Sequence, residues 1–245
     1  MPWDFALILI VLSTVVPCRS AVRMRQLLAR PQLTMTDRLG LYASTIAFQW
    51  LAMGVVGWRS YARGMTASEL GLALGREERI IVAAGGLTIL LALGQVVSLR
   101  YAARLPPERQ GFLQQLAVKI LPQNVVESLA FVALVSTVAV CEEFLYRGFI
   151  FAVLERATSS TGVAVAGSSL LFAVAHLYQG KRGMRTTFLV GLLFAVSRVW
   201  TGSVAPAVAA HLVVDLVAGL AAPRWFRRAA GGGEAGGSGR TGISL

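Results

Sequence analysis

Two histidines and three acidic residues are the side chains whose types and spacing could do chemistry in this chain. His176 and His211 are its only histidines, and both lie in apolar stretches, as do the adjacent Glu142 and Glu143 and the later Asp215. An ionisable side chain within a bilayer costs roughly 2.5–3.5 kcal/mol on insertion scales, so such groups are kept where they have a function. We therefore expect water-dependent chemistry within the membrane.

Glu142, Glu143 and Arg147 form the first group of candidates. On a helix, Glu143 and Arg147 lie four residues apart on one face and can form an ion pair. Glu142 is turned away from that face and stays free for other work, which is how acid and base roles are usually separated between two carboxylates. The structural alternative is an ion pair at a helix end, with Glu142 facing lipid headgroups.

His211 and Asp215 form the second group, and His176 stands apart from both groups. His211 and Asp215 are four residues apart in an Ala- and Val-rich stretch, so Asp215 can accept a hydrogen bond from one ring nitrogen and fix the tautomer. Packing between two helices is the structural alternative for this pair, and an interfacial position is the alternative for His176. One site with Glu142, His176 and His211 on three helices accounts for all of these residues together.

The composition predicts an all-α membrane protein. The chain has 245 residues, of which 56% are hydrophobic and 14% are charged, unlike the balance of a soluble domain. Several apolar runs approach the roughly 20 residues that a helix needs to cross a bilayer. We therefore expect a polytopic transmembrane helix bundle of about seven spans. The expected spans are Trp3–Pro17, Leu39–Trp58, Ile80–Leu99, Val125–Leu154, Val163–Tyr178, Met184–Trp200 and Val204–Ala222.

The formal net charge of +11 does not indicate nucleic acid in this context. Lys and Arg fall mostly between the apolar runs, where they determine topology and contact lipid headgroups, and no aromatic residues alternate with a basic stripe. Their distribution favours an N-terminus outside the cytoplasm, and the Arg- and Ala-rich composition favours a prokaryotic origin. We expect a multi-pass protein of the prokaryotic cell (inner) membrane, with the lipid bilayer as a partner and no nucleic acid.

Two segments differ from the spans. The segment Leu105–Leu121 has apolar residues at helical spacing among charged ones, which predicts an amphipathic interfacial helix on the cytoplasmic surface or an ordinary loop helix. A Gly-rich stretch follows Arg228 and has the composition of a flexible linker. The chain therefore divides into an N-terminal transmembrane region of about three spans (1–100), a catalytic core (101–222) and a basic, then Gly-rich, disordered tail (223–245).

Three short elements, in this order, resemble the CPBP family, the CAAX protease and bacteriocin-processing group of intramembrane endopeptidases. The family pattern consists of Glu-Glu-x-x-x-Arg, then Phe-x-x-x-His, then His-x-x-x-Asn or Asp. In this chain the three elements are Glu142, Glu143 and Arg147; Phe172 and His176; and His211 and Asp215. The resemblance covers about Leu121 to Leu216, somewhat under half of the chain.

The resemblance implies an all-helical membrane protease of the type that trims prenylated CAAX proteins. It also implies a role for each matching residue: water activation for Glu142 with His176, oxyanion stabilisation for His211 and Asp215, and support of the site for Glu143 and Arg147. Asp215 departs from the Asn version of the pattern. Because an ionised Asp only accepts hydrogen bonds, we expect Asp215 to orient His211, which would then be the main oxyanion donor.

Three other interpretations stay open. Two histidines and a glutamate are an adequate catalytic zinc set, but the spacing His-Glu-x-x-His is absent, so we expect no cofactor and keep zinc as the alternative. A non-catalytic membrane scaffold or partner-binding protein could retain the family fold. A proton-coupled transporter would show internal repeats, which the sequence lacks. The favoured hypothesis is an intramembrane glutamic-type endopeptidase that cuts a membrane-associated protein or peptide with Glu/His-activated water.

Overall fold

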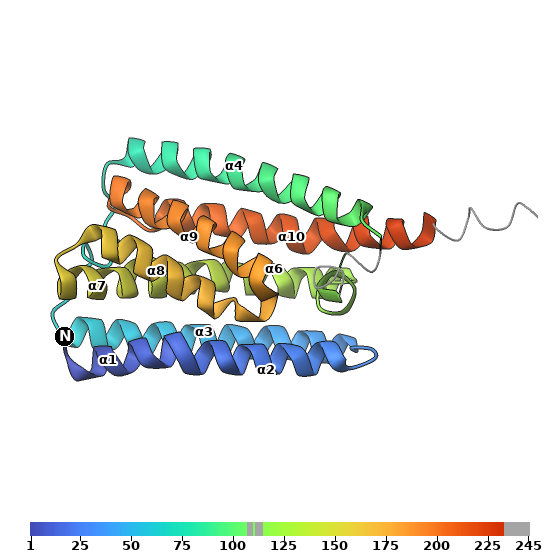
Figure 1. Ribbon diagram of the computed structural model, residues 1–245, viewed down its shortest axis with the longest axis horizontal. Helices are drawn as coiled ribbons and strands as arrows, with labels where there is room; N and C mark the ends of the chain where they lie inside the picture. The colour runs from blue at the N-terminus through green and yellow to red at the C-terminus, as the bar shows by residue number, and fades with distance from the viewer. Residues whose placement is uncertain (107–109, 111–114, 233–245) are drawn as a thin grey trace, which may run out of the picture.

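The computed structural model describes residues 1–106, 110 and 115–232, and every regular element in this part of the chain is helical. The long helices run along roughly one direction (Figure 1). The predicted all-α helix bundle is therefore confirmed. Its helices are α1 (Trp3–Ile10), η1 (Val11–Val15), α2 (Val16–Ala29), α3 (Met35–Ala62), α4 (Glu77–Arg104), α6 (Val125–Glu143), η2 (Phe144–Ile150), α7 (Phe151–Thr158), α8 (Thr161–Ala175), η3 (Leu177–Gln179), α9 (Gly180–Thr201) and α10 (Ala205–Gly232).

Five helices in the described part are long and apolar enough to cross a membrane, or up to six if one bent pair counts as a span. The bent pair is α8 with η3 and α9, whose axes differ by 60° across a short break. These helices occupy the region where the sequence predicts two separate spans, Val163–Tyr178 and Met184–Trp200. The predicted count of about seven is thus higher than length and composition support, because α8 has only 15 residues, about 22 Å of helix.

The helix bounds follow local sequence signals. Thr34 and Asp37 form a capping box at the start of α3, where the Asp37 backbone N–H donates to Thr34 Oγ1 at 3.1 Å. Asn124 caps α6 by accepting from the Glu127 backbone N–H at 2.9 Å. Because side-chain acceptors satisfy amide donors at both starts, α3 and α6 begin at defined residues.

Helices from distant parts of the chain lie side by side in the bundle. In Figure 1, α1–α2 and α3 form one edge, α4 forms the opposite edge, and α10 lies next to α4. The segments α6, η2 and α7 run through the interior, between α3 on one side and α10 on the other. Around η2, a cluster of buried side chains joins residues of α1, η1, α3 and α8. The interior segment therefore contacts helices from both halves of the chain.

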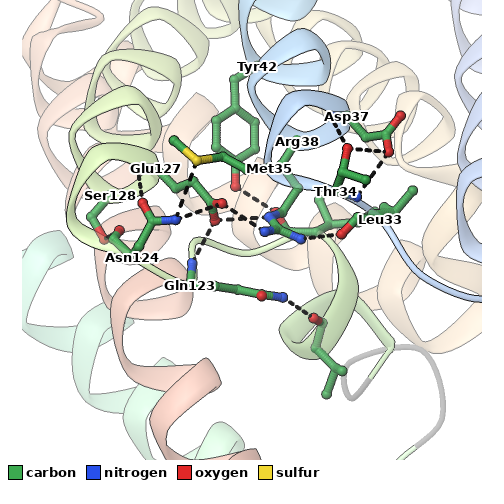
Figure 2. A network of polar contacts seen from close by, with 12 residues as sticks. Leu33, Thr34, Met35, Asp37, Arg38, Tyr42, Gln123, Asn124, Glu127 and Ser128 are labelled. Atoms are coloured by element: carbon green, nitrogen blue, oxygen red, sulfur yellow. Dashed lines mark hydrogen bonds and ion pairs between the residues drawn. The ribbon is translucent and has the colours of Figure 1, made fainter.

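A buried polar network joins the start of α3 to the start of α6 (Figure 2). Arg38 donates to both carboxylate oxygens of Glu127, from Nε at 2.9 Å and from Nη2 at 2.7 Å. Gln123 and Asn124 donate to the same carboxylate at 2.8 and 3.0 Å, and Arg38 also donates to the Leu33 carbonyl at 2.7 Å. Bidentate pairing and neighbouring donors satisfy the two buried charges, so this α3–α6 network sets the relative position of the two helices.

Two predicted segments fall partly on residues outside the described part. Of the predicted amphipathic helix Leu105–Leu121, residues 107–109 and 111–114 lie outside it, whereas 115–119 are helical. Ala117 there packs against Leu99 and Phe226. The predicted tail begins at residue 223, whereas α10 continues to Gly232 and packs against α4 as far as Phe226. Residues 233–245 of the predicted tail lie outside the described part.

Candidate active site

Four segments bring the six predicted site residues into one region of the bundle. Asp215 on α10 interacts electrostatically with two carboxylates of α6, those of Glu142 and Glu143. It also interacts with His211, on the same helix, and with His176, which follows α8. Arg147 of η2 completes the group through its contact with Glu143, described next. The three sequence groups therefore converge, although they are spread over more than seventy positions of the chain.

Glu143 is the centre of the hydrogen bonding in this region. Its Oε1 accepts a hydrogen bond from Arg147 Nη1 at 3.0 Å, and Glu143 and Arg147 are both fully buried. This is the ion pair expected from the spacing of four residues. The same oxygen lies 2.9 Å from His211 Nδ1. A single carboxylate oxygen thus connects α6, η2 and α10.

The Arg147 side chain lies between two aromatic rings. Its guanidinium carbon is 4.0 Å from the centroid of Phe172 and 5.2 Å from that of Phe194. A Cβ added at Gly191 would meet Nη2 of Arg147 at 3.2 Å, so a glycine at this position leaves room for the cation. Nε and Nη2 have no hydrogen-bond partner among the described residues. Ring faces attract a desolvated cation, so Phe172 and Phe194 stabilise the charge that Glu143 does not fully satisfy.

The backbone that carries Arg147 is a π-helix rather than the regular α-helix on which the spacing argument rests. All seven residues of η2, Phe144–Ile150, are buried. A π-helical stretch inside an α-helix is uncommon and often occurs at functional sites. The wider turn changes which residues share a face, and here it coincides with complete burial of one segment against several helices.

His211 is held between two carboxylates. Besides the contact of Nδ1 with Glu143, its Nε2 lies 3.5 Å from Asp215 Oδ2. The sequence predicts Asp215 as the group that orients His211, but the shorter contact in the structure is with Glu143, which the sequence assigns only to supporting Arg147. Both carboxylates only accept hydrogen bonds, so a doubly protonated His211 fits this arrangement with an N–H toward each of them. A distance of 3.5 Å is longer than an ordinary N–H···O bond, so the Nε2–H of this imidazolium can also donate to another oxygen.

His176 follows the last residue of α8, at the break before η3. Its Nδ1 lies 2.8 Å from the Phe172 carbonyl oxygen, which can only accept, so Nδ1 carries the proton in this arrangement. The ring packs against Phe172 with centroids 4.7 Å apart, and Phe172 is in turn 6.0 Å from the ring of His211. With Nδ1 protonated, Nε2 of a neutral His176 has a lone pair that can accept a proton.

Glu142 has a partner that the sequence reasoning missed. Gln49 of α3 donates from Nε2 to Glu142 Oε1 at 3.0 Å, whereas Oε2 is buried and has no hydrogen-bond partner among the described residues. Gln49 is uncharged, so it does not belong to the ionisable residues in apolar runs from which the site was predicted. An uncharged amide near the middle of the expected span Leu39–Trp58 was the available signal, since polar side chains in a span seek partners on neighbouring helices.

Together these side chains provide the parts of a hydrolytic site. Glu142 Oε2 and His176 Nε2 can accept protons, and His211 Nε2 can donate a hydrogen bond to an oxygen that becomes negative. Glu143 binds His211 and Arg147, and the Arg147 guanidinium packs against the rings of Phe172 and Phe194. A buried, largely apolar surrounding strengthens the electrostatic interactions of such groups.

Comparison with known proteins gives one family. Residues 124–217 match a family model, Rce1-like, described as Type II CAAX prenyl endopeptidase Rce1-like. This stretch of the chain is similar to that family. The resemblance to the CAAX proteases of the CPBP family is therefore confirmed over this stretch, and the match supports intramembrane endopeptidase activity in general. The searches of curated proteins and of solved structures gave no significant match.

The Rce1-like core, residues 124–217, contains all six predicted site residues, whereas Gln49 lies outside it. In the described part of the chain, no three His, Cys, Asp or Glu side chains are arranged to hold a metal ion. In the core, one oxygen of Glu143 is occupied by Arg147 and His211, and one oxygen of Glu142 by Gln49. One oxygen of each of these carboxylates is thus bound by side chains of the chain itself, whereas Oε2 of each has no hydrogen-bond partner among the described residues.

Proposed function

We propose that the protein is an intramembrane endopeptidase of glutamic type, which hydrolyses a peptide bond of a membrane-associated protein or peptide. The observation that carries the proposal is the convergence of Glu142, His176 and His211 from three helices, inside a region that matches an endopeptidase family. The bilayer that surrounds the site would be a prokaryotic cell (inner) membrane, as the composition favours.

The proposed reaction begins with a water molecule held between Glu142 Oε2 and His176 Nε2. Glu142 accepts one proton of this water while the water oxygen attacks the scissile carbonyl carbon. The Glu142 carboxyl then gives the proton to the leaving amine nitrogen as the C–N bond breaks. Positioned acid–base groups of this kind accelerate a reaction by roughly 10²–10⁴-fold.

The negative oxygen of the tetrahedral intermediate needs donors at the positions where its charge develops. His211 in its doubly protonated form is the proposed donor: its Nδ1–H is given to Glu143, and its Nε2–H has only the long contact with Asp215 among the described residues. Asp215 keeps the ring in place from the other side. Arg147 takes no part in the bond-making steps and instead holds Glu143, which holds His211.

The test compares cleavage by the full chain and its variants in lipid nanodiscs. The substrate panel contains prenylated CAAX peptides and unprenylated peptides with hydrophobic C-terminal tails. We expect the wild-type protein to cleave at least one member of the panel, and Glu142→Ala and His176→Ala to reduce kcat by at least about 100-fold. Asp4→Asn is the matched control, because Asp4 is a buried carboxylate on α1 whose ion pairs are with Arg59 and Arg63, which are not predicted site residues.

Each result separates two hypotheses. Unchanged cleavage in Glu142→Ala and His176→Ala would contradict the mechanism. A folded wild-type protein that cleaves no member of the panel would favour the alternative, a non-catalytic membrane scaffold or partner-binding protein. Cleavage that survives strong chelators supports the metal-free route, whereas loss in chelator and recovery with Zn²⁺ would favour zinc chemistry.

A further inference from the structure

Gln49 is a polar side chain that contacts the site although it lies outside the Rce1-like core. It lies on α3, half-buried, and its amide donates to Glu142 across 93 positions of sequence. A carboxylate only accepts hydrogen bonds, so the amide nitrogen of Gln49, and not its oxygen, must face an ionised Glu142. The contact thus has a defined direction.

This contact distinguishes the two oxygens of Glu142. Oε1 is occupied by Gln49, and Oε2 is buried without a hydrogen-bond partner among the described residues. A carboxylate held at one oxygen cannot rotate freely about its last side-chain bond, because rotation would break the hydrogen bond. The contact therefore leaves Oε2 as the oxygen available to a water molecule.

The position of Gln49 is itself fixed by contacts between α3 and α6. The adjacent residue, Trp50, donates from Nε1 to Thr137 Oγ1 on α6 at 3.2 Å. Three turns earlier on α3, Arg38 pairs with Glu127 in the α3–α6 network. These two contacts along one helix pair thus specify the register that places Gln49 beside Glu142.

We propose that Gln49 is a positioning residue, which holds Glu142 by one oxygen and directs the other oxygen toward the reacting water. The inference rests on the proposed function, because it assigns Gln49 a part in the action of the general base. It also means that the catalytic machinery extends beyond the family-matched segment and includes a helix of the N-terminal region.

The activity test uses two substitutions of Gln49 and one control. Gln49→Met keeps the length and volume of the side chain but removes the donor, and Gln49→Glu replaces the amide with an acidic group. Thr45→Val is the control, since Thr45 lies one turn earlier on α3 and, among the described residues, its hydroxyl bonds only to the Leu41 carbonyl. We expect Gln49→Met to lower kcat by roughly 10- to 100-fold with little change in KM, and Thr45→Val to match wild type.

The pH profile distinguishes positioning from packing. Without the donor, ionised Glu142 is less stabilised, so the acidic limb of the kcat/KM profile should move to higher pH in Gln49→Met. Gln49→Glu should be least active at neutral pH and recover toward acid, where the introduced carboxyl is protonated and can donate. Other groups that interact electrostatically with Glu142 are the same in all variants: Cys141, Glu143, Tyr146, Arg147, Tyr178, His211 and Asp215. An unchanged kcat and an unchanged profile in Gln49→Met would overturn the inference.

An infrared measurement tests the contact independently of proteolysis. The carboxyl bands of Glu142 are assigned by their loss in Glu142→Gln, and they should shift in Gln49→Met but not in Thr45→Val. A band that does not shift would overturn the inference even if the protein is a protease. If the wild-type protein cleaves no peptide, the proposed function fails, and a shifted band still shows that Gln49 holds Glu142.

Discussion

At the scale of the residue, Glu143 explains how the site can keep a buried cation. One of its oxygens accepts from Arg147 and contacts His211, and the arginine is stacked against Phe172. A buried ion pair is costly to break, because the partner that remains is an uncompensated charge. Glu143 therefore contributes to stability as well as to the orientation of His211.

Substitution of Glu143 by Gln should destabilise the fold by about 3–5 kcal/mol, because it leaves Arg147 buried without a counter-charge. Denaturant unfolding in micelles measures the loss, with Glu155→Gln as control, since the Glu155 carboxylate bonds Thr161 at an exposed position. The double variant Glu143→Gln with Arg147→Met should regain much of the stability while staying inactive. Equal stability of the single variant and wild type would contradict this account.

At the scale of the element, the relative position of α3 and α6 decides whether Gln49 and Glu142 can meet. The α3–α6 network lies at the start of both helices, where Arg38 and Glu127 are 6% and 0% exposed at their side chains. Because both side chains are this deeply buried, loss of either partner leaves the other as a buried charge without a counter-charge. The network therefore acts on the helix pair as a unit.

Arg38→Met should cost about 3–5 kcal/mol of stability, because Glu127 is then buried and unpaired. The double variant Arg38→Met with Glu127→Met should be more stable than the single variant, since apolar residues of similar volume often replace a buried ion pair at little cost. Thermal unfolding in nanodiscs measures both. If the double variant is no more stable than the single one, the charge imbalance is not the cause of the loss.

At the scale of the whole molecule, the loop after α3 ties one end of the bundle together. Glu69 accepts hydrogen bonds from the Thr66 backbone and from Arg156 of α7. Arg198 of α9 donates to the carbonyl oxygens of Ser68 and Glu69, and the Gly71 carbonyl accepts from the backbone before α10. This loop therefore links α3 to three helices of the second half of the chain.

The loop gives the fold a dependence on pH that can be measured. The Thr66 backbone N–H and the Arg156 guanidinium hold the pKa of Glu69 below its ordinary value of 4.5. The folded state thus binds this proton less readily than the unfolded state, so the stabilisation is complete above pH 4.5 and is lost as the pH falls through the lowered pKa.

We expect the protection factors of the Thr66 and Leu70 backbone amides, that is, their exchange relative to the intrinsic rate at the same pH, to fall below this range in wild type. Glu69→Gln should show faster exchange at neutral pH and a weaker acid response, because the amide cannot titrate. The same pH response in wild type and in Glu69→Gln would show that another group is responsible.

Local patterns in the sequence predicted much of the site. Charged and imidazole side chains within apolar runs, and spacings of four residues, are visible without a fold, and they identified Glu142, Glu143, Arg147, His176, His211 and Asp215. The same runs predicted an all-α membrane bundle, because a backbone in lipid must satisfy its own hydrogen bonds. The fold class is confirmed, and the six residues lie in one region of the structure, while their catalytic roles stay predictions. Each inference depends on a few neighbouring residues.

Only the tertiary structure decided which groups meet across helices. The contact of Glu143 with His211 and that of Gln49 with Glu142 join residues 68 and 93 positions apart, and no local spacing encodes such pairs. The 60° bend after α8 and the packing of Ala222 and Phe226 of α10 against Leu99 and Ala102 of α4 were likewise not visible in the hydropathy pattern. Composition and spacing thus determined the chemistry available to this protein, whereas long-range packing determined how its groups are paired.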